Sequence, residues 1–99
     1  MVVDDDPSIL ISVREVLESV GFEVVTVNSG RGCIEELQKG FRGVILMDIM
    51  MPGMDGWDTI KEIVDNNLLE GNLIAILTAK DQPDEKMDKL KEYVIDYLT

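Results

Sequence analysis

The chain has 99 residues, of which 45% are hydrophobic, and this suits one domain with a packed core and excludes a disordered segment. Its 20 acidic and 9 basic residues give a net charge of −11, which repels phosphate backbones and anionic bilayers, so we expect no direct binding to nucleic acid or membrane. The sequence has no histidine, which excludes histidine-based metal sites and triads, and its single cysteine, Cys33, forms no internal disulfide, which indicates a reducing, cytoplasmic location.

The first half of the chain alternates short apolar runs with amphipathic stretches. Val2-Val3 has the character of the end of a strand whose beginning is missing. After Pro7, apolar residues recur at helical spacing until Gly21, which stands where a helix C-terminal glycine belongs. Val24–Val27 predicts a second strand, and the pattern then predicts a second helix over 29–40.

The second half of the chain continues the alternation. Val44–Met47 and Leu73–Leu77 are continuously apolar, which is typical of strands buried on both faces of a parallel sheet. Between them, the spacing predicts a helix over about 57–66. A fourth helix is expected from near Pro83, and Tyr93–Leu98 predicts the last strand.

Strict alternation of strand and helix predicts one α/β domain over residues 1–99, with a doubly wound parallel sheet of five strands and right-handed crossovers. One more helix would be needed after Thr99 to cover the remaining face of the sheet. We therefore expect that this last helix is missing and that the domain is truncated at both ends.

Acidic residues stand at the predicted strand ends, where open parallel sheets bind their ligands. Asp4 and Asp5 follow the first strand, Asp48 follows the third and Thr78 follows the fourth. If the strand order is 2-1-3-4-5, these side chains converge. Three carboxylates in one pocket repel one another unless some are protonated or a cation lies among them, and Mg²⁺ suits this ligand set. Each residue taken singly also fits a turn or a helix cap.

Four segments resemble the receiver domains of two-component response regulators, and the match around Asp48 is the most specific. The resemblance spans the chain and implies the flavodoxin-like strand order 2-1-3-4-5. The four segments are Val2–Pro7, Val44–Gly56, Ile76–Ala79 and Asp96–Thr99.

The resemblance implies a role for each matching residue. Asp48 would accept a phosphoryl group, and Mg²⁺ would be held by Asp4, Asp5, Asp48 and the main-chain carbonyl of Met50. Two further residues would switch position in response, namely Thr78 and Tyr97. The implied phosphodonor is a sensor histidine kinase, and an effector domain, a downstream protein or a second copy of the chain would read the switch.

The chain departs from the family pattern where the family's lysine should follow Thr99. In addition, the apolar Met50 and Lys80 occupy positions that in this family influence hydrolysis of the phosphoryl group, and we expect a long-lived phosphoryl state because Met50 offers no polar help to an attacking water.

Three other functions remain open on the sequence. A degenerate receiver would serve only protein contacts, which the missing lysine favours. A Mg²⁺-dependent phosphatase with an aspartyl nucleophile would require an aspartate at the position of Met50. A flavodoxin-like cofactor binder would need a phosphate-binding loop where the chain has three aspartates, which would repel the phosphate.

Overall fold

The computed structural model describes residues 1–77 and 93–98, with the main chain alone for 95–98. Within this part, strands and helices alternate as the sequence predicts, and the fourth helix expected near Pro83 lies outside the described residues. The elements are β1 (Val2–Val3), α1 (Pro7–Ser19), β2 (Thr26–Val27), α2 (Gly30–Gln38), β3 (Gly43–Asp48), α3 (Gly56–Asp65), β4 (Asn72–Leu77) and β5 (Val94–Leu98).

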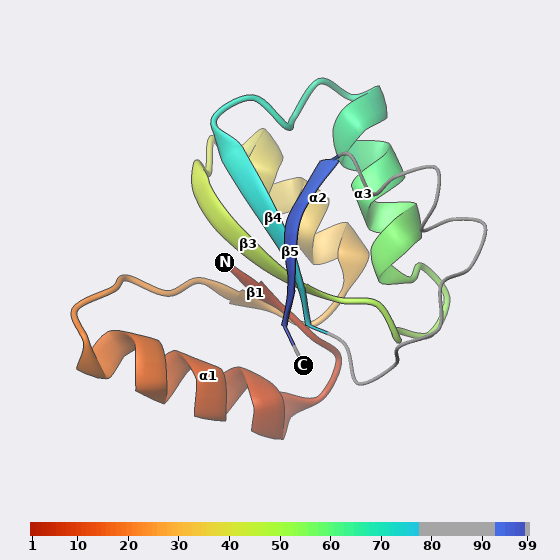
Figure 1. Cartoon of the computed structure of the whole chain (residues 1–99). Helices are drawn as coiled ribbons and strands as arrows, with labels where there is room; N and C mark the ends of the chain where they lie inside the picture. Colours follow the sequence, from red (N-terminus) through yellow and green to blue (C-terminus); the bar gives the residue numbers. More distant parts are fainter. Residues whose placement is uncertain (78–92, 99) are drawn as a thin grey trace.

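The five strands form one parallel sheet in the order β2-β1-β3-β4-β5, which confirms the predicted topology (Figure 1). In the register, Val3 of β1 lies beside Met47 of β3, so the residues that follow these two strands leave the sheet side by side. β2 is shorter than predicted, but Val25 still pairs through its carbonyl with the Val2 N–H at 2.8 Å.

Local sequence signals set the helix ends. Asp6 caps α1, accepting a hydrogen bond from the Ser8 N–H at 2.9 Å, and Pro7 occupies the first turn, where its missing N–H costs little. After α1 the chain turns through Gly21, whose φ of 97° is readily adopted only by glycine. The start of α3 is fixed by a capping box between Asp55 and Asp58.

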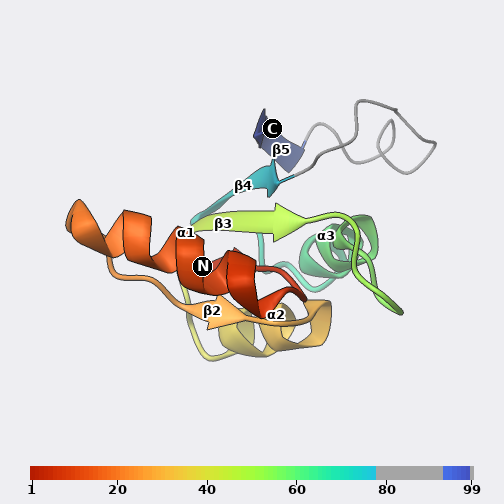
Figure 2. The ribbon, with the colours of Figure 1, turned by 90° about the horizontal axis from the view of Figure 1, so that it is seen from below.

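The face of the sheet that carries α2 and α3, here named the packed face, holds the hydrophobic core (Figure 2). Because side chains alternate along a strand, every second residue of β3 and β4 points to this face. These residues are fully buried beneath apolar side chains of α2 and α3. The set comprises Ile45, Met47, Ile74 and Ile76 from the strands and Ile34, Leu37, Ile60 and Ile63 from the helices.

The opposite face, here named the open face, carries α1 as its one described helix (Figure 1). α1 packs chiefly on β1 and β2, so Val2 is buried, while Val44 of β3 and Leu73 of β4 remain 47% and 51% exposed. No residue of α1 itself is fully buried, although its apolar residues recur at helical spacing. Among the described residues, no helix combines the length and apolarity needed to cross a bilayer.

Candidate metal centre

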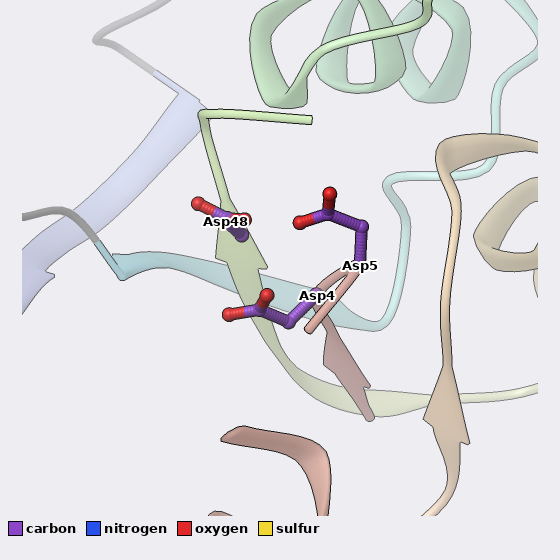
Figure 3. A group of neighbouring side chains, drawn as sticks. All are labelled: Asp4, Asp5 and Asp48. Atoms are coloured by element: carbon purple, nitrogen blue, oxygen red, sulfur yellow. The ribbon is translucent and has the colours of Figure 1, made fainter. Parts of the chain in front are cut away.

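Three carboxylates meet at the carboxyl ends of two neighbouring strands. Asp4 and Asp5 follow β1, Asp48 ends β3, and one oxygen from each lies within 4.8 Å of the others. Figure 3 shows the three side chains pointing toward one another. The parallel register of β1 and β3 places them so, because Asp4 and Asp48 are the next residues after the Val3–Met47 pair.

The main chain around the cluster is fixed by the carboxylates themselves. Asp4 accepts a hydrogen bond from the Asp6 N–H at 2.9 Å, and Asp48 accepts one from the Met50 N–H at 3.0 Å. Each of these hydrogen bonds closes a local turn of the kind that aspartate side chains commonly stabilise. Asp6 turns away from the cluster to cap α1, so the third aspartate of the run has a purely structural role in these contacts.

Burial and repulsion perturb Asp48. Its pKa is raised from 3.8 to about 6, mainly because burial disfavours the charged form, and the nearby charges of Asp4 and Asp5 raise it further. The hydrogen bond from Met50 acts in the opposite direction. Asp4 is only 7% exposed, so the cluster places acidic groups where solvent screens them poorly. A cation in the cluster would relieve this repulsion.

The donor set fits Mg²⁺ in kind and in size. The ion prefers carboxylate oxygen and water at about 2.0–2.1 Å, so two oxygens bound to one ion are at most about 4.2 Å apart. The three oxygens lie within 4.8 Å of one another, so a small contraction, or one ligand acting through water, would accommodate the ion. Asp5 is exposed and Asp48 half-buried, which leaves a side of the cluster open to solvent.

The remaining predicted site residues are only partly placed. The side chain of Met50 is 57% exposed beside the cluster. Thr78 and Lys80 lie outside the described residues. Tyr97 is placed through its main chain alone, which pairs with Ile76 between β4 and β5.

Two features near the cluster escaped the sequence analysis. Gly56 lies against the main chain of Asp48, and the capping box of Asp55 and Asp58 anchors the first turn of α3. An acidic residue three positions after Asp55 was the available signal for the cap. Trp57 and Cys33 are buried in the core, and burial raises the pKa of the Cys33 thiol to about 12.

Comparison with known proteins identifies a family over the full length of the chain. The response regulator receiver domain matches residues 1–99. Among solved structures, a CheY-like response regulator receiver domain protein from Methanospirillum hungatei JF-1 has 55% sequence identity and a TM-score of 0.93, over 99% of this chain and 78% of that one.

Two curated relatives are longer proteins. The sensor protein GacS of Pseudomonas syringae pv. syringae is 37% identical over 98% of this chain and 11% of its own length. The alkaline phosphatase synthesis transcriptional regulatory protein PhoP of Bacillus subtilis is 31% identical over 100% of this chain and 40% of its own length. The chain therefore spans less than half of either relative.

Proposed function

Because the chain belongs to the response regulator receiver family, we propose that it is a phosphoacceptor domain in which Asp48 takes a phosphoryl group in a Mg²⁺-dependent reaction. The observation that carries the proposal is the convergence of three carboxylates at the ends of β1 and β3. Phosphoryl transfer and its metal dependence are general properties of the family, and the three neighbouring carboxylates of this chain support the proposal that it shares them.

Asp48 acts as the nucleophile. A carboxylate oxygen of Asp48 forms a bond to phosphorus, the bond from phosphorus to the imidazole nitrogen of the donor breaks, and that nitrogen keeps the electron pair. The attacking group must be ionised, and its raised pKa of about 6 leaves most of it ionised at neutral pH. The hydrogen bond from the Met50 N–H holds one oxygen and so orients the other.

Mg²⁺ would be held by Asp4, Asp5, Asp48 and the main-chain carbonyl of Met50, with Asp4 acting mostly through water. At this cluster it would supply positive charge that offsets the charge of the carboxylates and of the phosphoryl oxygens. The ion is needed at this cluster, because the same three charges would otherwise repel the phosphoryl group.

Phosphorylation changes which partners the domain binds rather than starting the turnover of a separate substrate. Thr78 and Tyr97 are proposed to move toward the phosphoryl group and so shift the population of two conformations. A dedicated phosphatase is disfavoured by Met50, which has no acid or base. We further propose slow hydrolysis of the phosphoryl group for the same reason, and its rapid loss at neutral pH would contradict this.

The proposed phosphodonor is a phosphohistidine of a sensor kinase in the cytoplasm. An effector domain or a separate protein would read the switch. The names of two curated relatives support the link to sensors and to effectors, since one is a sensor protein and the other a transcriptional regulatory protein. We also propose that two copies of the domain form a dimer. A degenerate receiver, used only for protein contacts, is not favoured because Asp4, Asp5 and Asp48 are all present and close together.

Intact-protein mass after incubation with phosphoramidate and Mg²⁺ tests the proposal. We expect a gain of one phosphoryl mass that disappears without Mg²⁺ and in Asp48→Asn. Asp6→Asn is the matched control, because Asp6 belongs to the same acidic run but caps α1 outside the cluster, and it should be phosphorylated like the wild type. Phosphorylation of Asp48→Asn to the wild-type extent would reject Asp48 as the nucleophile.

A further inference from the structure

Gly56 lies unusually close to the main chain of the proposed nucleophile. A Cβ at this position would be 2.4 Å from the carbonyl oxygen of Asp48 and 2.8 Å from the Cα of Ile49. Real Cβ atoms essentially never make contacts below 3.0 Å. Since the obstructing atoms belong to the main chain, no side-chain rotation can relieve the clash. The first residue of α3 therefore rests on the end of β3 only because it has no side chain.

Hydrogen bonds connect the same glycine to the loop that follows Asp48. The carbonyl of Ile49 accepts from the N–H of Gly56 and from the N–H of Met51, each at 3.1 Å. The second of these bonds closes a three-residue turn with Met50 at its centre. The N–H of Met50 is in turn held by Asp48 at 3.0 Å. The Ile49 carbonyl thus links the first residue of α3 to Met51, and Ile49 and Met51 are the two neighbours of Met50 in the chain.

This arrangement also determines the direction of the Met50 carbonyl. In a trans peptide the N–H and the C=O point in opposite directions, and the described chain has no cis peptide. The N–H of Met51 points to Ile49, so the carbonyl of Met50 in the same peptide unit points away from it. Any displacement of Gly56 would move the shared acceptor and rotate this peptide.

The start of α3 is itself firmly anchored. The capping box joins Asp55 and Asp58, with the Asp58 N–H donating to Asp55 at 2.8 Å, and the buried Thr59 hydroxyl donates to the Asp55 carbonyl at 2.8 Å. A first turn held in this way cannot yield easily to a new methyl group. We expect the loop from Ile49 to Met54, which precedes the capping box, to yield instead.

We propose that Gly56 is a positioning residue for the Mg²⁺ site. It allows α3 to seat against β3 so that the carboxylate of Asp48 and the carbonyl of Met50 face the same ion. The inference rests on the proposed function, since it presupposes that Mg²⁺ binds at Asp4, Asp5 and Asp48. Its competitor is that Gly56 serves packing alone, in which case its replacement would lower stability and leave the affinity of folded protein for Mg²⁺ unchanged.

NMR titration of Gly56→Ala and Gly40→Ala with Mg²⁺ alone distinguishes a positioning role of Gly56 from a role in packing alone. Gly40 follows α2 and has a φ of 108°, and a Cβ added there would meet no atom within 4 Å, so alanine strains the chain far from the cluster. We expect the dissociation constant for Mg²⁺ to rise about tenfold to a hundredfold in folded Gly56→Ala, as for losses of outer-shell support, and to stay within about twofold in Gly40→Ala. Wild-type affinity in Gly56→Ala would overturn the inference.

Hydrogen exchange of the wild type provides a second test that does not depend on the folding of a variant. We expect Mg²⁺ to slow exchange of the Gly56 and Met51 amides, which share the Ile49 carbonyl, and to leave the Gly40 amide unchanged. Equal exchange at Gly56 and Met51 with and without Mg²⁺ would overturn the inference alone. A wild type in which Mg²⁺ shifts no resonance of Asp4, Asp5 or Asp48 would overturn the proposed function, and this inference with it.

Discussion

The two faces of the sheet are built from the same alternating strands but are covered very differently. On the packed face, Ile63 of α3 and Ile74 of β4 are both 0% exposed. On the open face, Leu73, the neighbour of Ile74, is 51% exposed, and Val44 of β3 is 47% exposed. Because the residue types are alike, the difference in burial comes from the helices that lie above each face. The packed face should therefore supply most of the free energy of folding.

The proposed site lies at the edge of the open face. By alternation along β3, Asp48 continues the row of Val44 and Leu46, and Asp4 continues the row of Val2 in β1. The proposed site thus lies at the end of the less covered face, where a carboxylate can be half-buried and still meet solvent. Substitutions matched between the two faces can test this division of roles.

The largest contrast is expected between an isoleucine of the packed face and an isoleucine on the exposed side of α1, where Ile11 is 59% exposed. Ile63→Ala leaves a cavity in the core, and we expect it to lower the free energy of unfolding by about 2–5 kcal/mol. Ile11→Ala removes the same atoms from an exposed position, and we expect a change below about 0.5 kcal/mol. Urea denaturation followed by the fluorescence of Trp57, which is buried in the core, measures both. Similar losses in the free energy of unfolding of the two variants would show that burial on the packed face does not dominate stability.

A smaller effect is expected where α2 and α3 touch on the packed face. A Cβ at Gly30 would lie 2.1 Å from the hydroxyl oxygen of the buried Thr59. We expect Gly30→Ala to destabilise by about 1–3 kcal/mol through overpacking. Adding Thr59→Ala makes room for the methyl, so the double variant should be more stable than the sum of the single losses allows. Additive losses of stability in this double-mutant cycle would show that Gly30 of α2 and Thr59 of α3 are not in contact.

The sequence predicted the framework well because the signals for it are local. Pro7 and Gly21 bound the first helix in both the prediction and the structure. The apolar runs predicted the strands, whereas their order was implied by the resemblance to receiver domains and agrees with the structure. The sequence also placed Asp4 and Asp48 at strand ends, from which their proximity follows once the order is given. The periodicity of α1, however, could not say whether anything covers its apolar side, since that depends on the neighbouring elements.

The role of Gly56 could not be predicted, because it depends on a contact between residues that are separated in the sequence. Gly56 follows an aspartate and has the sequence character of a simple turn residue, yet the contact that requires glycine is with the carbonyl of Asp48, eight positions earlier. By contrast, the sequence already separated Asp4 and Asp5, as predicted site residues, from Asp6, since an aspartate directly before Pro7 is a local signal for the helix cap that Asp6 forms.

A still smaller effect is expected at Asp48 itself, in protein free of divalent metal. Its pKa is about 6 in the folded chain against 3.8 ordinarily, so the folded state holds more protons between these values and stability falls as the pH rises through that window. Asp48→Asn keeps an acceptor for Met50 without the charge. We expect it to stabilise the chain at pH 7 by roughly 1 kcal/mol, a figure reduced because Asp48 is half-exposed.

The control for this prediction is the pH itself. As the pH falls from 7 to 4, Asp48 of the folded wild type becomes protonated, so the difference in stability between the wild type and Asp48→Asn should be largest at pH 7 and smallest at pH 4. Urea denaturation in EDTA at pH 4, 5, 6 and 7 measures it. A variant that is less stable than the wild type at pH 7 would show that Asp48 is not held in an unfavourable charged state.

The smallest effect is expected at Leu73, near the start of β4 on the open face. Leu73→Thr removes an apolar side chain that is 51% exposed and replaces it by a residue that favours strands, so we expect a change in the free energy of unfolding below about 0.5 kcal/mol in dilute protein. The adjacent Ile74→Thr, on the packed face, should lose several times more. If Leu73→Thr instead cost more than about 1 kcal/mol, Leu73 would have to be covered in solution. Sedimentation of the wild type across concentrations would then show whether a second copy of the chain provides that cover, because the loss would grow with concentration only in that case.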